Sequence, residues 1–312
     1  MRFASVLDSI GHTPLVELAR FSPKPGIRIF AKLEGYNPSG SVKDRIAREM
    51  IEEAEASGQL RPGQVILEPS SGNTGIALAM VGAIKGYRVT IVMPENVSQE
   101  RVQLLEAYGA EIVSSEGELG TNGSIAVAQK LAEDPRYFMP YQYGNAANPG
   151  AHYATTAPEI LEDMGDLPVD VFVGGMGTGG TLMGVARRLK EHRPSTRVIA
   201  VEPHPGDSVQ GLRSLAEGFI PPIIDLSLLD GKMLCASRDA FVATRELLRR
   251  EGLFAGVSSG AVIHGALRVA QRMEQGNIVC LLADGGWKYL STGLWTKELD
   301  ELERTLEGQV LW

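Results

Sequence analysis

The fold is decided by residues 65–93, which read VILEPSSGNTGIALAMVGAIKGYRVTIVM. The runs 65–67 and 88–93 are apolar on both faces and rich in β-branched residues, and the segment 76–85 between them has helical character. Strands of this kind, separated by helices, form parallel sheets that are covered on both sides. The stretch therefore predicts a strand–helix–strand unit of an α/β protein.

The same alternation continues on both sides of a break. We expect a helix over about 98–108 and a strand at 111–113, and then a second series with strands at 169–173, 197–201 and 277–282 and a helix over about 181–192. Residues 143–150 lie between the two series and are rich in Gly, Asn and Pro. The predicted fold class is α/β, with two lobes that meet near this break.

Composition limits the classes of function. A chain of 312 residues is longer than one hydrophobic core usually organises. Its net charge of −8 arises from mixed signs without a basic tract, so nucleic acid is not an expected partner. Cys235 and Cys280 have no metal-ligand spacing, and we expect both to be buried free thiols. The start of the sequence carries no secretory signal, and no apolar run has membrane-spanning length, so we expect a cytoplasmic protein without a membrane partner.

Two glycine-rich loops follow predicted strands and precede helices. The first, 70–75, offers hydroxyl and amide donors at a helix N-terminus, which favours a carboxylate or a phosphate. The second, 174–181, is also suited to an anion, and its two threonines favour a terminal phosphate. It contains a G-x-G-x-x-G pattern, with Glu202 at the end of the next strand, which matches dinucleotide-binding proteins. An NAD-dependent dehydrogenase is therefore an alternative at this point.

A third element, 37–45, places a lysine in the first turn of a helix capped by Ser39 or Ser41. The helix dipole and burial would both lower the pKa of Lys43, as a nucleophilic amine requires. The alternative is an exposed lysine paired with Asp44.

Together these three elements resemble the cysteine synthase branch of the fold-type II pyridoxal-phosphate enzymes. The resemblance is carried in order by Ile10–Val16, Asn37–Arg45, Ser70–Gly75, Met93–Glu95, Tyr141–Asn145, Gly177–Thr181, Gly256–Gly260 and Tyr289–Thr292. It implies two lobes, each with a twisted and mostly parallel sheet flanked by helices. Residues 35–145 would form the smaller, mobile lobe, and residues 1–34 and 146–312 the larger lobe, which binds the cofactor phosphate. It also implies a homodimer.

The resemblance also implies roles for individual residues. Lys43 would hold pyridoxal 5'-phosphate as an internal aldimine and move the substrate Cα proton. Asn73 would bond the cofactor's 3-hydroxyl and Ser258 would lie at its pyridine nitrogen, where a hydroxyl leaves the ring a weak electron sink and so favours β-elimination to an aminoacrylate. The cofactor phosphate would be bound by Gly177, Thr178, Gly179, Gly180 and Thr181, and the substrate α-carboxylate by Ser70, Ser71, Thr74 and Gln142.

The sequence departs from the common pattern of this family at one place, which concerns the choice of substrate. Relatives that use O-acetylserine usually carry a sequence like QGIGAGFIP, whereas this chain has Arg213 within 210–221. A guanidinium suits a phosphate dianion better than a neutral ester. Three segments resemble the actinobacterial cysteine synthases that take O-phosphoserine and accept sulfur from a thiocarboxylated carrier protein. They are 210–221, 283–293 and 306–309. We expect Arg213 to bind the leaving phosphate; an exposed loop arginine is the alternative.

Several alternatives stay open at this stage. An O-acetylserine sulfhydrylase that uses sulfide would share every motif except that of Arg213. A catalytically silent relative is a further possibility, which an intact Lys43 disfavours. The apolar tail 309–312 is predicted to fold over the cleft as a lid, with a plain packing or dimer contact as the alternative.

Overall fold

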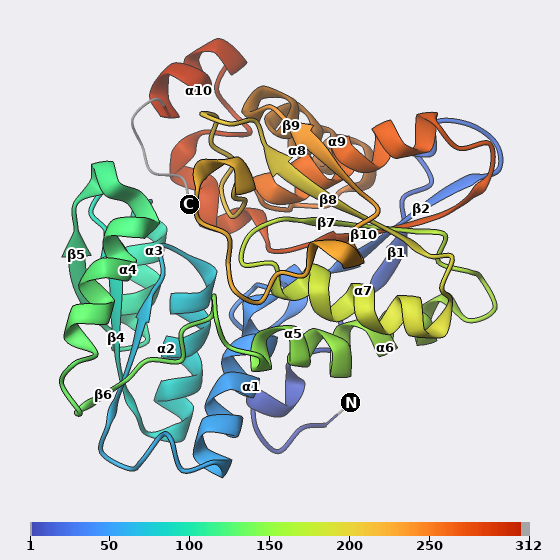
Figure 1. The fold of residues 1–312 in the computed structure, drawn as a ribbon. Coiled ribbons are helices and arrows are strands. Elements are labelled where there is room, and N and C mark those ends of the chain that lie inside the picture. The colour runs from blue at the N-terminus through green and yellow to red at the C-terminus, as the bar shows by residue number, and fades with distance from the viewer. Residues whose placement is uncertain (1, 307–312) are drawn as a thin grey trace.

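A computed structural model describes residues 2–306, except for a few side chains, and contains two separate β-sheets, each between layers of helices (Figure 1). The larger sheet has six strands in the order β1-β2-β10-β7-β8-β9. Only β1 runs antiparallel to its neighbour. The strands are β1 (Leu15–Glu17), β2 (Ile27–Leu33), β7 (Val171–Gly175), β8 (Arg197–Pro203), β9 (Gly231–Cys235) and β10 (Gly276–Leu282).

The smaller sheet is entirely parallel and has the order β5-β4-β3-β6. Its strands are β3 (Val65–Pro69), β4 (Arg88–Pro94), β5 (Glu111–Ser115) and β6 (Tyr137–Phe138). All of β3 and all of β4 beyond its first residue are buried. Burial on both faces is the reason that these strands are continuously apolar in sequence.

Helices cover both faces of each sheet. In the smaller lobe α1 (Lys43–Ala56), α2 (Asn73–Lys85) and α3 (Gln99–Ala107) share one core, and α4 (Gly120–Leu131) packs on the opposite face. In the larger lobe α6 (Ala157–Met164) and α7 (Gly180–His192) lie on one face, and α8 (Ser237–Glu251) and α9 (Val257–Gln271) on the other. The structure also contains α5 (Ala147–Ala151), the π-helix η4 (His152–Thr156), α10 (Leu299–Leu306) and several 3-10 helices, of which η7 (Gly286–Thr292) is the longest.

The predicted α/β class is confirmed, and each predicted strand and helix is present to within a few residues. Strands β1, β2, β6 and β9 were not predicted. The lobe boundaries at 35–145 stay a prediction, and the predicted lid at 309–312 lies outside the described residues. Both cysteines are buried and free, as expected. Over residues 2–306 no helix is long and apolar enough to cross a membrane, and no acidic, His or Cys cluster suits a metal ion.

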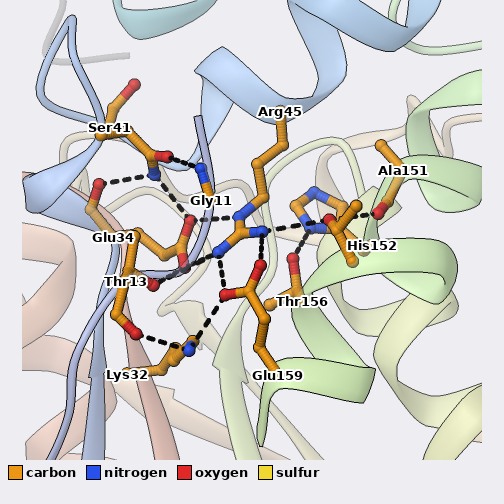
Figure 2. Close-up of polar contacts among 12 residues, drawn as sticks. Gly11, Thr13, Lys32, Glu34, Ser41, Arg45, Ala151, His152, Thr156 and Glu159 are labelled. Atoms are coloured by element: carbon orange, nitrogen blue, oxygen red, sulfur yellow. Dashed lines mark hydrogen bonds and ion pairs between the residues drawn. The ribbon is translucent and has the colours of Figure 1, made fainter. Parts of the chain in front are cut away.

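A buried ionic cluster connects α1 to the larger lobe (Figure 2). The Arg45 guanidinium donates to both carboxylate oxygens of Glu34, at 2.7 and 2.8 Å, and to both of Glu159, at 2.6 and 2.7 Å. Lys32 Nζ lies 3.0 Å from Glu159 Oε2. Burial alone would raise the pKa of each carboxyl, but Arg45 lowers both, and the pKa of Glu159 falls to about 2. Arg45 lies two residues after Lys43, so this cluster fixes the first turn of α1.

Replacing Arg45 with methionine should destabilise the holoenzyme by about 3–5 kcal/mol, because Glu34 would stay buried without its counter-charge and Glu159 would keep only Lys32. Urea unfolding at pH 7 measures the effect. The control is Arg28→Met, which removes an equally close but exposed pair with Glu17, and should cost about 0–1 kcal/mol. Equal losses in the two variants would contradict a stabilising role for the cluster.

Candidate active site

Most of the predicted site residues line one cavity, formed by loops at the carboxyl ends of β3 and β7. The cavity is lined by Lys43, Ser70, Ser71, Asn73, Thr74, Gln142, Gly177, Thr178, Arg213 and Ser258. An adjoining cavity shares several of these residues and adds Gly179 and Thr181. Gly180 lines neither cavity, although its backbone N–H donates to Thr178 Oγ1 at 3.4 Å. The structure thus brings together side chains that are up to 215 residues apart in the sequence.

Lys43 is the first residue of α1 and is partly buried. Burial lowers the pKa of its amine to about 8, against the opposing influence of Asp284. The predicted serine cap is wrong, since Val42 occupies the N-cap, although Ser41 Oγ accepts from the Lys43 backbone N–H at 3.2 Å. An exposed pair with Asp44 is also wrong, because Asp44 is buried and accepts from the backbone N–H of Ser39 at 2.6 Å.

This lowered pKa gives a pH-dependent prediction. Only the neutral amine attacks an aldehyde, so the rate at which apoenzyme binds pyridoxal phosphate covalently should rise about tenfold per pH unit below pH 8 and level off above it. Stopped-flow absorbance over pH 6–10 measures the rate. In Asp284→Asn the plateau should begin at lower pH, because the Asp284 charge raises the Lys43 pKa. A wild-type rate that still climbs beyond pH 10 would indicate an ordinary lysine.

The loop after β7 forms a cradle suited to a phosphate. Gly179 has φ +90° as the N-cap of α7, and a Cβ on Gly180 would lie 1.8 Å from Asn148 Oδ1. Thr178 Oγ1 accepts from Asn148 Nδ2 at 3.1 Å and from Gly180 N, which leaves its proton for a ligand. Thr181 Oγ1 is 3.2 Å from His152 Nε2. Backbone N–H groups at a helix N-terminus, with hydroxyl donors beside them, fit a phosphate monoester.

The loop after β3 lies at the N-terminus of α2 and contacts Gln142. Ser70 Oγ accepts from the backbone N–H of Gly75 at 3.0 Å, and Thr74 Oγ1 donates to Gln142 Oε1 at 2.7 Å. The Gln142 backbone N–H donates to Glu68 at 3.0 Å. Burial raises the pKa of Glu68 to about 8, despite this bond and that from Tyr141. Glu68 therefore lies beneath the loop, and its two oxygens hold the backbone of Tyr141 and Gln142 in place.

Asn73 is held by partners that sequence reasoning missed. Its Nδ2 donates to Asp284 Oδ2 at 2.8 Å, and its Oδ1 accepts from Lys288 Nζ at 2.7 Å. Tyr289 also donates to Asp284 Oδ2, at 2.6 Å. Asp284 and Lys288 are buried, and both follow β10 in the sequence. Each Asn73 polar atom keeps capacity for one more bond, so the side chain can still face a ligand.

Arg213 lies in the cavity wall, with its guanidinium 4.9 Å from the Phe219 ring centroid and 5.7 Å from that of Tyr143. Its backbone N–H donates to Met176 O at 2.6 Å. Among the side chains that the structure describes, no carboxylate forms an ion pair with Arg213. The cavity is also lined by residues that we did not predict, among them Arg101, Thr121, Tyr143 and Tyr289. The Tyr141–Asn145 motif already contained Tyr143, but nothing in the sequence distinguished Arg101 from a solvated helix residue.

Glu202, on which the dinucleotide alternative depends, is engaged inside the protein. It is buried, accepts from the backbone N–H of Leu215 at 3.2 Å, and lies 3.4 Å from Lys232 Nζ. A ribose would have to displace these partners. The geometry therefore disfavours a dinucleotide at the loop after β7.

Comparison with known proteins agrees with this geometry. Residues 6–284 match the model of a family described as "Pyridoxal-phosphate dependent enzyme". The chain belongs to this family. A probable cysteine synthase of Bacillus subtilis is 46% identical over 305 residues, covering 94% of this chain and 98% of the relative. Cysteine synthase B of Escherichia coli is 44% identical over 291 residues, covering 93% and 96%.

A solved structure agrees with these relatives. A crystal structure of cysteine synthase (OASS) from Entamoeba histolytica has a TM-score of 0.89 and 38% identity, covering 98% of this chain and 96% of that one. The protein is therefore a pyridoxal-phosphate-dependent enzyme of the cysteine synthase type, and the predicted cofactor and enzyme class are confirmed. The residues of the cavity fit the cofactor: a glycine cradle for its phosphate, and a lysine of lowered pKa for its aldehyde.

Proposed function

We propose that this enzyme makes L-cysteine from O-phospho-L-serine by β-replacement. With hydrogen sulfide as donor, the Cβ–O bond breaks, a Cβ–S bond forms, and hydrogen phosphate leaves. The observation that carries the proposal is Arg213, a guanidinium in the cavity wall with no carboxylate ion pair among the described side chains. A neutral acetyl group would give this charge no anionic partner, whereas a phosphate dianion satisfies its fork of donors.

The other residues of the cavity have distinct tasks in this reaction. Bound pyridoxal phosphate supplies the electron sink, which makes the substrate Cα proton acidic. Lys43 Nζ holds the cofactor and then accepts that proton. Ser70, Ser71 and Thr74 bind the α-carboxylate with the α2 N-terminus, and Gln142 assists them. The backbone of 177–181, with Thr178 and Thr181, binds the cofactor phosphate, while Asn73 and Ser258 contact its ring.

The proposed physiological sulfur donor is a small carrier protein with a C-terminal thiocarboxylate. Its sulfur would form the new bond to Cβ, and water would then cleave the acyl–sulfur bond, releasing cysteine and the carrier carboxylate. The support is the resemblance of 210–221, 283–293 and 306–309 to enzymes that use such a donor. The competing proposal, O-acetylserine with sulfide, is supported by the name of the Entamoeba histolytica relative.

Initial rates of cysteine formation separate the two proposals. Purified holoenzyme is supplied with O-phosphoserine or O-acetylserine, and with sulfide or the thiocarboxylated carrier protein, in all four combinations. We expect kcat/KM for O-phosphoserine to exceed that for O-acetylserine at least tenfold, and the carrier to outcompete sulfide at equal concentration. A preference for O-acetylserine would reject the phosphoserine proposal and favour the competing one.

We further propose that the enzyme is a cytoplasmic homodimer, as the resemblance implies. Analytical ultracentrifugation at micromolar concentration tests the assembly, and cell fractionation of the native source tests the location. A monomer at these concentrations would reject the first proposal, and recovery outside the cytoplasm would reject the second.

A further inference from the structure

The wall of the cavity in the smaller lobe consists of loops that follow three neighbouring strands. Loop 70–74 follows β3, Arg101 lies in the first turn of α3 after β4, and Thr121 lies in the first turn of α4 after β5. Because β3, β4 and β5 are adjacent and parallel, their carboxyl ends lie along one edge of the sheet. Only the β3 loop has a task in the proposed function. The β4 and β5 positions have no task in it.

Arg101 is a charged residue that is buried with some of its hydrogen-bond donors unpaired. Only 4% of its surface is exposed, and within residues 2–306 its Nε and Nη1 atoms have no hydrogen-bond partner. A buried unpaired guanidinium is costly, and the Tyr289 ring, 5.6 Å from its Cζ, offsets the cost only in part. Arg101 lines the cavity, so an anion that enters could complete its bonding.

The position of Arg101 is fixed from two sides. The neighbouring Glu100 accepts from the backbone N–H and the hydroxyl of Ser291, at 2.6 and 2.7 Å, which holds α3 against η7. On the other side, a Cβ on Gly72 would lie 3.6 Å from Arg101 Nε and 3.7 Å from its Cζ, at ordinary contact distance. The guanidinium therefore stands in a slot between the β3 loop and Tyr289. Its Nε and Nη1 atoms are enclosed in this slot, so an anion reaches them once the side chain turns toward the cavity.

The anionic groups of the first substrate are already assigned elsewhere. Its α-carboxylate is assigned to loop 70–74, and its phosphate to Arg213, which has different neighbours, Tyr143 and Phe219. The second half of the reaction brings in another anion, because sulfide and thiocarboxylates both react in the ionised form. Arg101 and Thr121 offer a guanidinium and a hydroxyl along one edge of the cavity for such a group.

We propose that Arg101, with Thr121, forms a separate anion subsite that binds the incoming sulfur nucleophile, a thiocarboxylate or hydrosulfide anion. The proposal rests on the β-replacement function proposed above. Arg101 acts by contact with the nucleophile before Cβ–S bond formation, and it takes no part in the loss of the leaving group. An edge of the guanidinium that turns toward the cavity offers two parallel N–H groups, which fit the two atoms of a thiocarboxylate better than the single atom of hydrosulfide.

Double-mixing stopped flow separates the two half-reactions. Holoenzyme is first mixed with O-phosphoserine until the absorbance change of leaving-group loss is complete, and then with thioacetate or sulfide. In Arg101→Met the second-order rate constant for thioacetate should fall about 10–100-fold, while the first step changes less than threefold. Arg88→Met, an exposed arginine on β4, is the matched control and should change neither step. Thr121→Val should lower only the rate constant of the second step.

The conservative variant tests whether the charge or the packing matters. Arg101→Lys should keep most of the rate with sulfide but lose more with thioacetate, because lysine lacks the fork of donors. A loss confined to thioacetate in Arg101→Met indicates a thiocarboxylate source, and a similar loss with both donors indicates a general sulfur-anion subsite; either supports the proposal. An equal fall in both half-reactions, or no change in the second, would overturn it.

A binding measurement distinguishes failure of this proposal from failure of the proposed function. Calorimetric titration with acetate, an unreactive isostere of thioacetate, requires no turnover. The holoenzyme is first saturated with L-alanine, which has no β-leaving group and whose α-carboxylate occupies loop 70–74. Wild type and Arg88→Met should bind acetate alike, and Arg101→Met about tenfold more weakly. Weaker binding in Arg101→Met would support the anion subsite even if O-phosphoserine proved not to be a substrate. Identical acetate binding in all three proteins would reject the subsite even if cysteine synthesis were established.

Discussion

Replacing Lys43 with alanine should lower kcat for cysteine formation by at least about 10³-fold, the largest effect that we expect from any single substitution. Proton transfer by a positioned side chain alone contributes about 10²–10⁴-fold. The variant also loses its covalent hold on the cofactor. Cysteine formation under saturating substrate measures kcat, and dialysis followed by absorbance spectroscopy measures retention of the cofactor.

Lys130→Ala is the control, because Lys130 is an exposed lysine on α4 in the same lobe. It should retain wild-type turnover and cofactor. Phosphate binding at the loop after β7 does not depend on the amine, so Lys43→Ala should still bind pyridoxal phosphate reversibly. A Lys43→Ala variant with more than a tenth of wild-type kcat would show that another group moves the proton.

Replacing Arg213 with alanine should lower kcat/KM for O-phosphoserine about 10–1000-fold, the range for a lost contact between charged groups. The same change should leave kcat/KM for O-acetylserine within about threefold of wild type, because the neutral ester gains little from a guanidinium. Steady-state kinetics with both esters on wild type and variant measure this difference.

Arg213→Lys provides a second test of the same contact. It retains the positive charge but not the planar fork, so it should recover part of the lost activity with O-phosphoserine. Since Arg213 also lies over the rings of Tyr143 and Phe219, the alanine variant removes packing as well as charge. Equal loss with both esters would assign Arg213 to packing of the wall and remove the basis for the phosphoserine proposal.

The sequence predicted the parts of the fold that local pattern determines. The run 65–93 is apolar on both faces of its strands, and it forms β3, α2 and β4 as expected. Strand β9 was missed because its burial alternates and its residues, Gly231–Cys235, include a glycine and a lysine. Strand β6 has only two residues, and β1 lies at the sheet edge and is largely exposed. Such strands are defined by their neighbours in the sheet more than by their own composition.

The sequence predicted those parts of the site in which the residue types of a single loop indicate what the loop binds. The glycine and hydroxyl loops 70–74 and 177–181 are recognisable because their residue types suit backbone approach to an anion. Arg101 and Lys288 were missed because each is a cation on a helix, and burial of a cation depends on packing from distant segments. The cluster of Arg45, Glu34 and Glu159 was missed for the same reason.

The central claim is that pyridoxal phosphate is bound to the protein through the amine of Lys43. Peptide mass spectrometry of holoenzyme reduced with borohydride tests it most directly. We predict one reduced pyridoxyl phosphate adduct, on the peptide that contains Lys43, and unmodified peptides for the other lysines. A protein reconstituted with pyridoxal phosphate that shows no adduct at Lys43, or carries it on a different lysine, would contradict the account.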